Sequence, residues 1–202
     1  MSASHDWSAT VDRGHLAHIR RHAAEFAPGG VPHLVLEVLA YAADEAELTG
    51  RPRCAVTLHP DGSIEIADSG RGTDTRLDPS GRPVRKPVLA TKDLRFFDAP
   101  DAPPLPDGHP RRGMSVVAAL SEWLAHTNRR LAGAWTQRYE HGVPVTDLVP
   151  IDADGTTGTE VWFRPDEAIQ ASQLSVAELS RLARSWPQLS IAITDRRLGR
   201  GG

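Results

Sequence analysis

The chain has 202 residues, 40% of them hydrophobic, which suffices for one compact domain with a buried core but is short for two. Its 23 Lys and Arg against 26 Asp and Glu give a net charge of -3, so no bulk attraction to nucleic acid is expected. The single cysteine, Cys54, excludes an internal disulfide, and no apolar run suits a membrane span or a secretory signal. We therefore expect a soluble, cytoplasmic protein without direct nucleic-acid or membrane binding, in which Cys54 is an inert, buried thiol.

The N-terminal third predicts an arm and two helices. Residues 1–12 are polar and predict an N-terminal arm, ahead of a single domain over 13–202. Apolar residues recur at helical spacing from 13 to 26, where Ala-Pro-Gly-Gly follows. A second, more strongly periodic helix is predicted to start near Pro32 and to end before Gly50.

The middle of the chain predicts a hairpin followed by loops. Residues 55–59 and 63–67 are strand-like and are joined by the turn residues Pro60, Asp61 and Gly62. Residues 68–113 are rich in Pro, Gly and Asp, and they include a long lid-like loop at about 93–113. Loops of this length inside a domain are usually functional or disordered.

The last half of the chain predicts mostly strands. A helix is expected over 113–127, then strands near 127–131, 134–139, 145–148 and 159–163. A last helix with Ser175 as its N-cap precedes a final strand at 189–195. This order predicts an α+β fold, a two-layer sandwich of a mixed, mostly antiparallel sheet covered on one face by helices.

Acidic residues interrupt the apolar pattern of the second helix. Glu37, Tyr41, Asp44 and Glu45 share one helical face. Asp44 and Glu45 are equally well interpreted as the solvated end of the helix. Glu37 lies between Leu36 and Val38, where an unpaired buried carboxylate is costly, and His33 one turn earlier is its expected hydrogen-bond partner.

A second polar motif, "IADSGRGTD", follows the second strand of the hairpin. Asp68 comes directly after a hydrophobic strand, and Gly70 and Gly72 flank Arg71. The glycines allow a planar ligand to approach the backbone while Asp68 accepts a hydrogen bond from it. The same pattern also makes ordinary turns, so its combination with Glu37 is what favours a site.

Five collinear segments resemble one known family: "HLVLEVLAYAADEAELTG", "IEIADSGRGTD", "GMSVVAALSEWL", "QRYEHGVPVTDL" and "TTGTEVWFRPD". They are similar, in order and spacing, to the N-terminal ATPase domain of the DNA gyrase B protein. That domain belongs to the GHKL group and has the Bergerat ATP-binding fold. The similarity runs from about Leu16 to "LSIAITDRR", so it covers nearly the whole chain.

The resemblance implies roles for individual residues. Glu37 matches the general base that activates the attacking water, and His33 matches the histidine that supports it. Asp68 matches the aspartate that accepts the adenine amino group. The remaining nucleotide-site matches are Thr159, which assists that aspartate, the adenine-pocket glycines Gly70 and Gly72, Arg71 in an ion pair with Glu45, Arg130 at a rim that aminocoumarin inhibitors also contact, and Gly113 of the phosphate loop.

The phosphate half departs from the family pattern. Tyr41 stands where the family has the asparagine that holds Mg²⁺, and "DLRFFD" replaces a Gly-Gly-Lys lid segment. The phosphate loop reads "GHPRRG", in which Pro110 has no N–H to donate. Thr73 and Asp74 replace an Ile-Pro pair, which puts a charge near the pocket mouth.

These departures predict a domain that binds ATP or ADP but whose ATP hydrolysis is impaired or absent and whose Mg²⁺ site is doubtful. Two alternatives stay open. The fold could serve as a scaffold for a partner protein or an aminocoumarin-like small molecule. Alternatively, the chain is a working ATPase of type II topoisomerase type, in which Arg111 or Arg112 replaces the lysine, although a solvated loop tip is the simpler interpretation of these arginines.

Overall fold

A computed structural model describes residues 11–50, 52–73, 79–80, 89–99, 101–170 and 174–197. Most of the predicted N-terminal arm, residues 1–10, and Asp74 lie outside the described residues. Within the described part, no helix combines the length and apolar character that crossing a membrane requires. The cytoplasmic location and the domain boundaries stay predictions.

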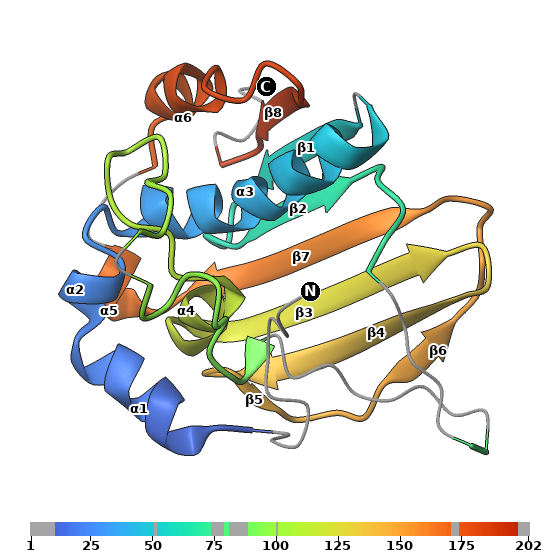
Figure 1. Cartoon of the computed structure of the whole chain (residues 1–202), viewed down its shortest axis with the longest axis horizontal. Coiled ribbons are helices and arrows are strands. Elements are labelled where there is room, and N and C mark those ends of the chain that lie inside the picture. The colour runs from blue at the N-terminus through green and yellow to red at the C-terminus, as the bar shows by residue number, and fades with distance from the viewer. Residues whose placement is uncertain are drawn as a thin grey trace.

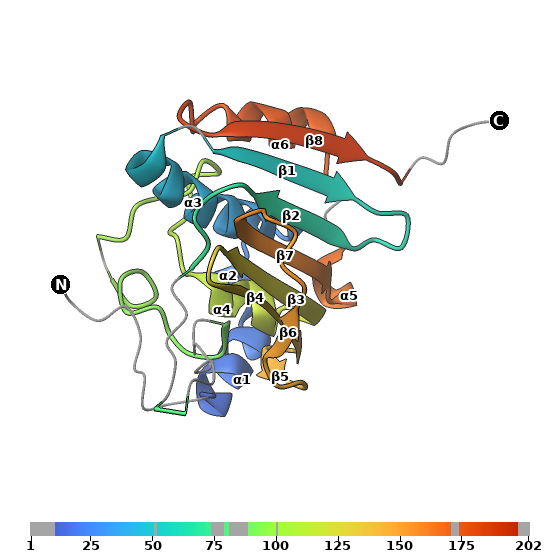
Figure 2. The ribbon, with the colours of Figure 1, turned by 90° about the vertical axis from the view of Figure 1, so that its right-hand side faces the viewer.

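The core of the fold is one mixed sheet of eight strands in the order β5-β4-β3-β7-β2-β1-β8, with β6 pairing with β4. All described pairings are antiparallel except that of β1 with β8, which is parallel. Figure 2 shows the strands stacked from β8 down to β5. The strand bounds are Arg53–Leu58 (β1), Ile64–Asp68 (β2), Ser121–Arg130 (β3), Gly133–Glu140 (β4), Val143–Pro144 (β5), Val149–Ile151 (β6), Gly158–Pro165 (β7) and Ser190–Asp195 (β8).

Helices cover one face of this sheet (Figure 1). The helix bounds are Arg13–Arg21 (α1), Ala23–Phe26 (α2), Val31–Thr49 (α3), Met114–Ala119 (α4), Glu167–Gln170 (α5) and Val176–Ala183 (α6). The opposite face carries partly exposed side chains, including the edge-to-face pair Trp123 and Trp162. The predicted α+β sandwich of a mixed, mostly antiparallel sheet and covering helices is therefore confirmed.

Helix α3 is the element that positions the candidate site, and its predicted extent is confirmed. Pro32 occupies its first turn, where a missing N–H leaves no intrahelical bond unmade. Leu34, Val35 and Leu39 are fully buried, and α3 packs on β2. Burying this apolar stripe, rather than helix propensity alone, fixes the rotation of α3 on the sheet.

The predicted helix over 13–26 is interrupted. The chain forms α1 and α2 with a break at His22, whose φ of -119° and ψ of 37° lie outside the helical region. The break directs Phe26 onto Phe97, with ring centroids 5.1 Å apart. Tertiary packing thus overrides a continuous helical pattern.

The predicted helix over 113–127 is wrong in its second half. Helix α4 ends at Ala119, and β3 begins at Ser121, whose Oγ donates a hydrogen bond to the Val117 carbonyl oxygen. Residues 121–130 pair with both β4 and β7, so the segment is a central strand. Its apolar spacing is compatible with a buried helix and with a buried strand, and periodicity alone does not separate the two.

The remaining predictions are mostly confirmed. The hairpin forms as β1 and β2, and Ser175 caps α6 by accepting a hydrogen bond from the Glu178 N–H at 3.4 Å. The predicted strand at 145–148 is wrong, because these residues form the connection between β5 and β6. Thr146 in this connection contacts β4 through its carbonyl and hydroxyl oxygens. Cys54 is buried, and this burial raises the pKa of its thiol to about 12, as expected for an unreactive thiol.

Candidate functional site

A cavity of about 410 Å³ lies between α3 and the sheet. This volume is within the range of small-molecule sites, about 300–1,000 Å³. Its lining combines apolar side chains, among them Val38, Ala42, Ile66 and Val161, with polar ones such as Asp68, Arg95 and Thr159. A flat, partly apolar ligand with polar edges fits such a lining.

Asp68, the last residue of β2, lines the cavity. Its Oδ1 accepts a hydrogen bond from the Gly70 N–H at 2.8 Å, and the main chain of Thr159 on neighbouring β7 also hydrogen-bonds the carboxylate. Burial nevertheless raises the pKa of Asp68 above its usual range, and the nearby Glu45 adds to the rise. A carboxylate has about four lone-pair sites, so Asp68 can accept a further bond from a ligand.

The loop after Asp68 forms the rim of the cavity. The predicted ion pair is present, with Arg71 Nε 2.8 Å from Glu45 Oε1. At Gly72 the backbone has φ +73°, and a Cβ would collide with the Arg129 carbonyl oxygen, so only glycine fits. Arg130 lines the same rim and donates to the Gly72 carbonyl oxygen at 3.4 Å.

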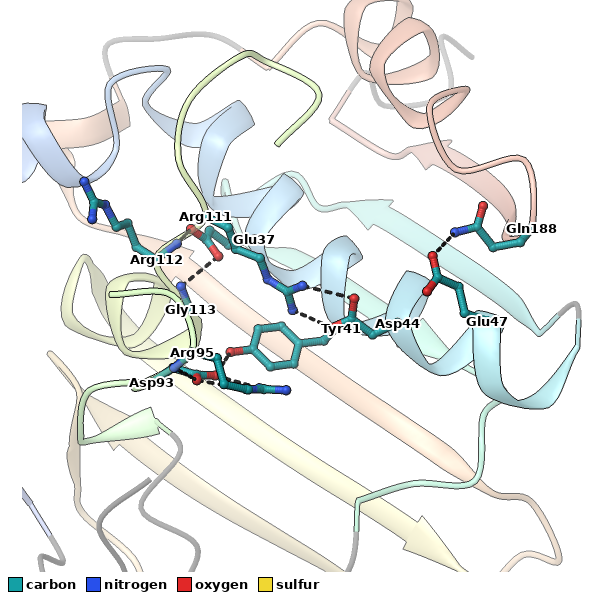
Figure 3. A network of polar contacts seen from close by, with 10 residues as sticks. All are labelled: Glu37, Tyr41, Asp44, Glu47, Asp93, Arg95, Arg111, Arg112, Gly113 and Gln188. Atoms are coloured by element: carbon teal, nitrogen blue, oxygen red, sulfur yellow. Dashed lines mark hydrogen bonds and ion pairs between the residues drawn. The ribbon is translucent and has the colours of Figure 1, made fainter. Parts of the chain in front are cut away.

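Glu37 is fully buried, and both of its carboxylate oxygens are engaged. Oε1 accepts a hydrogen bond from the Arg112 N–H at 2.5 Å, and Oε2 accepts one from the Gly113 N–H at 2.9 Å (Figure 3). Burial raises the pKa of Glu37, while these N–H groups and His33 oppose the rise. The carboxylate thus links α3 to Arg112 and Gly113, the two residues that precede α4.

His33 does not form the predicted hydrogen bond with Glu37. Its Nε2 lies 3.7 Å from Glu37 Oε1, and this nitrogen has no hydrogen-bond partner among the described residues. Its Nδ1 instead contacts Asp107 Oδ2 at 2.7 Å. The contact with Asp107 fixes the orientation of the ring, and in this orientation Nε2 stays beyond hydrogen-bond distance of Glu37.

Tyr41 is held by an acidic residue of the loop. Its hydroxyl donates a hydrogen bond to Asp93 Oδ2 at 2.8 Å, and burial together with Asp93 raises the pKa of the phenol. The Arg95 guanidinium binds the same carboxylate through Nε at 3.0 Å and Nη2 at 2.7 Å, which holds the pKa of Asp93 below its usual range against burial. Tyr41 therefore stays a neutral donor in this site.

Arg111 fills the space beside Tyr41. Its guanidinium carbon lies 4.4 Å from the centroid of the Tyr41 ring and 4.0 Å from that of Phe96, within the range of cation–π contacts. It also pairs with Asp44 at 2.8 Å. The interpretation of Arg111 as part of a solvated loop tip is wrong, because only 4% of the residue is exposed.

These contacts form one continuous set between α3 and the segment 93–113, which we call the closing segment. Each of four α3 residues, His33, Glu37, Tyr41 and Asp44, contacts the closing segment, and they follow one another along one face of the helix. The predicted lid-like loop is thus fastened to α3 along this face.

Known proteins similar to this chain include the B subunits of DNA gyrase and of DNA topoisomerase 4. It is 35% identical over 173 residues to the B subunit of DNA gyrase from Thermotoga maritima and 33% identical over 178 residues to the B subunit of DNA topoisomerase 4 from Staphylococcus epidermidis. It is 32% identical over 206 residues to the B subunit of DNA gyrase from Streptomyces coelicolor. The chain is homologous to the N-terminal GHKL ATPase domain of these proteins. No protein-family model matches it.

The match covers most of this gyrase-B-like domain but a minor part of each relative. It spans 83%, 85% and 97% of the chain in the three comparisons, and 27%, 27% and 30% of the relatives. The chain therefore corresponds to little more than a quarter of their length, and the resemblance seen in the five motifs is confirmed at that level.

The site residues that the resemblance assigns fall into two groups in this gyrase-B-like domain. Five of them line the cavity: Asp68, Arg71, Gly72, Arg130 and Thr159. The Gly70 N–H donates a hydrogen bond to Asp68. His33, Glu37 and Gly113 are not among the residues that line the cavity. Their catalytic and binding roles stay predictions.

The magnesium site of the family does not fit these residues. Mg²⁺ requires a tight octahedron of oxygen ligands, and Tyr41 offers a phenol that already donates its proton to Asp93. Asp93 is in turn bound by Arg95 through two hydrogen bonds. Within the described part of the chain, no group of three or more His, Cys, Asp or Glu is arranged to hold a metal ion.

Sequence reasoning missed several residues of the site, namely Asp93, Arg95, Phe96, Asp107, Met114 and His126. The first four lie in the proline-rich loop, where periodicity gives no information. A usable signal was the aromatic pair Phe96 and Phe97, since apolar rings in a polar loop indicate that the loop packs on something.

Proposed function

We propose that this chain is a gyrase-B-type adenine-nucleotide-binding domain whose ATP hydrolysis is impaired or absent. The observation that carries the proposal is the state of Glu37, which is 0% exposed and accepts main-chain hydrogen bonds on both oxygens. A general base must reach the proton that it removes, directly or through one water. A carboxylate without solvent exposure is poorly placed for this role, which supports impaired hydrolysis.

The residues at the metal and lysine positions support the same proposal. Phosphoryl transfer depends on positioned charges that neutralise the terminal phosphates, each typically worth about 10²–10³ in rate. Tyr41, Arg95 and Arg111 are instead engaged with Asp93 and Asp44. With these groups paired to carboxylates, the described residues of the site offer few charges for this reaction.

The adenine end supports nucleotide binding. Asp68 can accept a hydrogen bond from an exocyclic amino group, while Gly70 and Thr159 hold its carboxylate in place. Gly72, where a Cβ would collide with the Arg129 carbonyl oxygen, lets the loop after Asp68 pack closely on β3 at the cavity rim. The relatives are gyrase and topoisomerase 4 proteins, and GHKL ATPase domains of the gyrase-B kind bind ATP, which favours adenine over other flat ligands.

Calorimetric titration of the purified chain with ADP tests the binding half of the proposal. We expect saturable binding, and we expect Asp68→Asn to weaken it about tenfold to a hundredfold, because a hydrogen bond to a charged group contributes about 1.5–3 kcal/mol. Asp152→Asn, the same substitution at an exposed position, is the matched control and should bind ADP normally.

Absence of binding by AMP, ADP and ATP alike at millimolar concentration, or unchanged binding by Asp68→Asn, would contradict the proposal. Binding of the aminocoumarin novobiocin without any nucleotide would instead favour the scaffold alternative. Retention of the Asp68, Thr159 and Arg130 cluster at the cavity is compatible with both ligand types, so novobiocin belongs in the same titration series.

A further inference from the structure

The described arginines around the cavity are all engaged by carboxylates or main-chain oxygen. Arg71 pairs with Glu45 at 2.8 Å and Arg95 with Asp93 at 2.7 Å. Arg111, behind Tyr41, pairs with Asp44 at 2.8 Å, and Arg130 donates to the Gly72 carbonyl oxygen. Arg71, Arg95 and Arg111 are therefore held by ion pairs, and only the N–H donors that these pairs do not use are left for a ligand.

Breaking the pair of Arg95 with Asp93 is especially unfavourable. The Asp93 side chain is 1% exposed, so its carboxylate would lose its cation in a buried position, which is strongly destabilising. Arg95 is 44% exposed and lines the cavity, and a guanidinium has further N–H donors besides the two that bind Asp93. It can therefore contact one phosphate while keeping Asp93.

The main-chain N–H groups that precede α4 are already used within the protein and do not point to further phosphates. The Gly113 and Arg112 N–H groups, which sit at the start of α4, already donate to Glu37. A Cβ built on Gly113 would lie 3.1 Å from the Tyr41 hydroxyl oxygen, so the ring and the main chain are in close contact there. The protein itself therefore uses these two N–H groups, and the Tyr41 ring fills the space next to Gly113.

We propose that the cavity selects an adenine ligand with no more than one phosphate, a nucleoside or nucleoside monophosphate, and binds it without Mg²⁺. This inference rests on the proposed function, because it takes Asp68 as the adenine acceptor. This is the class of ligand that could contact Asp68 and Arg95 at the same time, since both line the cavity. Adenine bonds Asp68, the sugar lies along the apolar walls, and a single phosphate meets Arg95.

The test is a calorimetric series with adenosine, AMP, ADP and ATP, each in EDTA and again with MgCl₂. We expect adenosine and AMP to bind at least about tenfold more tightly than ATP, with less than about a twofold effect of Mg²⁺. ATP binding as tight as AMP, or strengthened about tenfold by Mg²⁺, would overturn this inference and leave the proposed function standing. Absence of binding by all four ligands would overturn both.

Variants at Tyr41 test the cause of the selection. Tyr41→Ala removes the ring that closes the phosphate end, so the preference for AMP over ATP should narrow about tenfold. Tyr41→Phe keeps the ring and should retain the wild-type preference. An unchanged preference in a folded Tyr41→Ala protein would overturn the inference. If Tyr41→Ala does not fold, Asp93→Asn, which releases the charge of Arg95, should narrow the preference instead, and an unchanged preference there would count equally against it.

Discussion

At the residue scale, Glu37 shows how main-chain N–H groups can satisfy a buried acid. Its two oxygens accept the N–H groups of Arg112 and Gly113. A carboxylate can accept on both oxygens, which an amide side chain cannot do. These two hydrogen bonds give the acid on the apolar side of α3 a structural role, and its catalytic role stays a prediction.

Glu37→Gln should lower the free energy of unfolding by about 1–3 kcal/mol, because the amide places one N–H donor against another in a buried position. Urea denaturation measures the change. Glu47→Gln is the matched control on the same helix, where the carboxylate is exposed and accepts a bond from Gln188 at 3.3 Å. Equal effects of the two substitutions would show that the contacts of Glu37 do not stabilise the fold.

His15 gives a pH-dependent prediction. Burial lowers the pKa of His15 to about 4, with Lys92 also lowering it and Asp12 and Asp98 opposing. Its Nε2 contacts the Ser115 hydroxyl at 2.9 Å, and its ring meets Phe97 edge-on. As the pH falls through the ordinary histidine pKa, the unfolded chain takes up a proton that the folded chain does not, so stability decreases.

Between about pH 7 and about pH 5, His15 should therefore remove about 1–2 kcal/mol of unfolding free energy. Other groups also titrate in this range, so the measurable quantity is the difference between the wild type and His15→Gln, which lacks this proton. His18→Gln, at an exposed position of α1, should keep the wild-type slope. A His15→Gln slope equal to the wild-type slope would contradict the prediction.

At the element scale, α3 and the closing segment behave as one unit. Four α3 side chains contact the closing segment, at Asp107, at the N–H groups of Arg112 and Gly113, at Asp93 and at Arg111. A surface loop held by one such contact would open easily, because exposed pairs contribute only about 0–1 kcal/mol each. Several contacts, some of them buried, should keep the closing segment on the helix.

Arg111→Met tests this attachment. The methionine keeps much of the side-chain volume but loses the ion pair with Asp44 and the cation–π contacts with the Tyr41 and Phe96 rings. We expect amide hydrogen exchange in residues 105–113 to speed up about tenfold or more, since a local loss of about 1.4 kcal/mol corresponds to a factor of ten. Arg20→Met, at an exposed position of α1, is the control. Unchanged exchange in Arg111→Met would mean that other contacts hold the segment.

Local patterns predicted some elements well and failed at others for identifiable reasons. The periodic stripe of α3 and the Pro-Asp-Gly turn of the hairpin are local signals, and both elements formed as expected. Residues 121–127 are wrongly predicted as helical because their apolar spacing fits both periods, and pairing with β4 and β7 fixes them as a strand. The break at His22 similarly depends on packing against Phe97.

At the scale of the whole molecule, the family and the adenine end of the cavity were accessible from the sequence, because motifs such as that around Asp68 are contiguous. The phosphate end was not. It depends on contacts between residues such as Tyr41 and Asp93, which are 52 positions apart. The sequence indicates that Tyr41 replaces an asparagine, but only the fold shows that its hydroxyl is hydrogen-bonded to Asp93 of the closing segment.

These observations describe a cavity that is lined by Asp68 at the proposed adenine end and by Tyr41 and Arg95 at the proposed phosphate end. The sheet and α3 provide the cavity, as in a nucleotide-binding domain, while α3 and the closing segment use Glu37 for their mutual attachment. Ligand binding and hydrolysis should therefore be separable properties of this chain.

The most direct test is steady-state ATP hydrolysis with MgCl₂, measured on the wild type and on Glu37→Gln under conditions where calorimetry detects ligand binding to the wild type. We expect both proteins to release phosphate at the rate of the protein-free control, with Glu37→Gln differing from the wild type only in stability. Turnover by the wild type that Glu37→Gln abolishes would contradict a structural role for Glu37 and would establish this chain as a working ATPase.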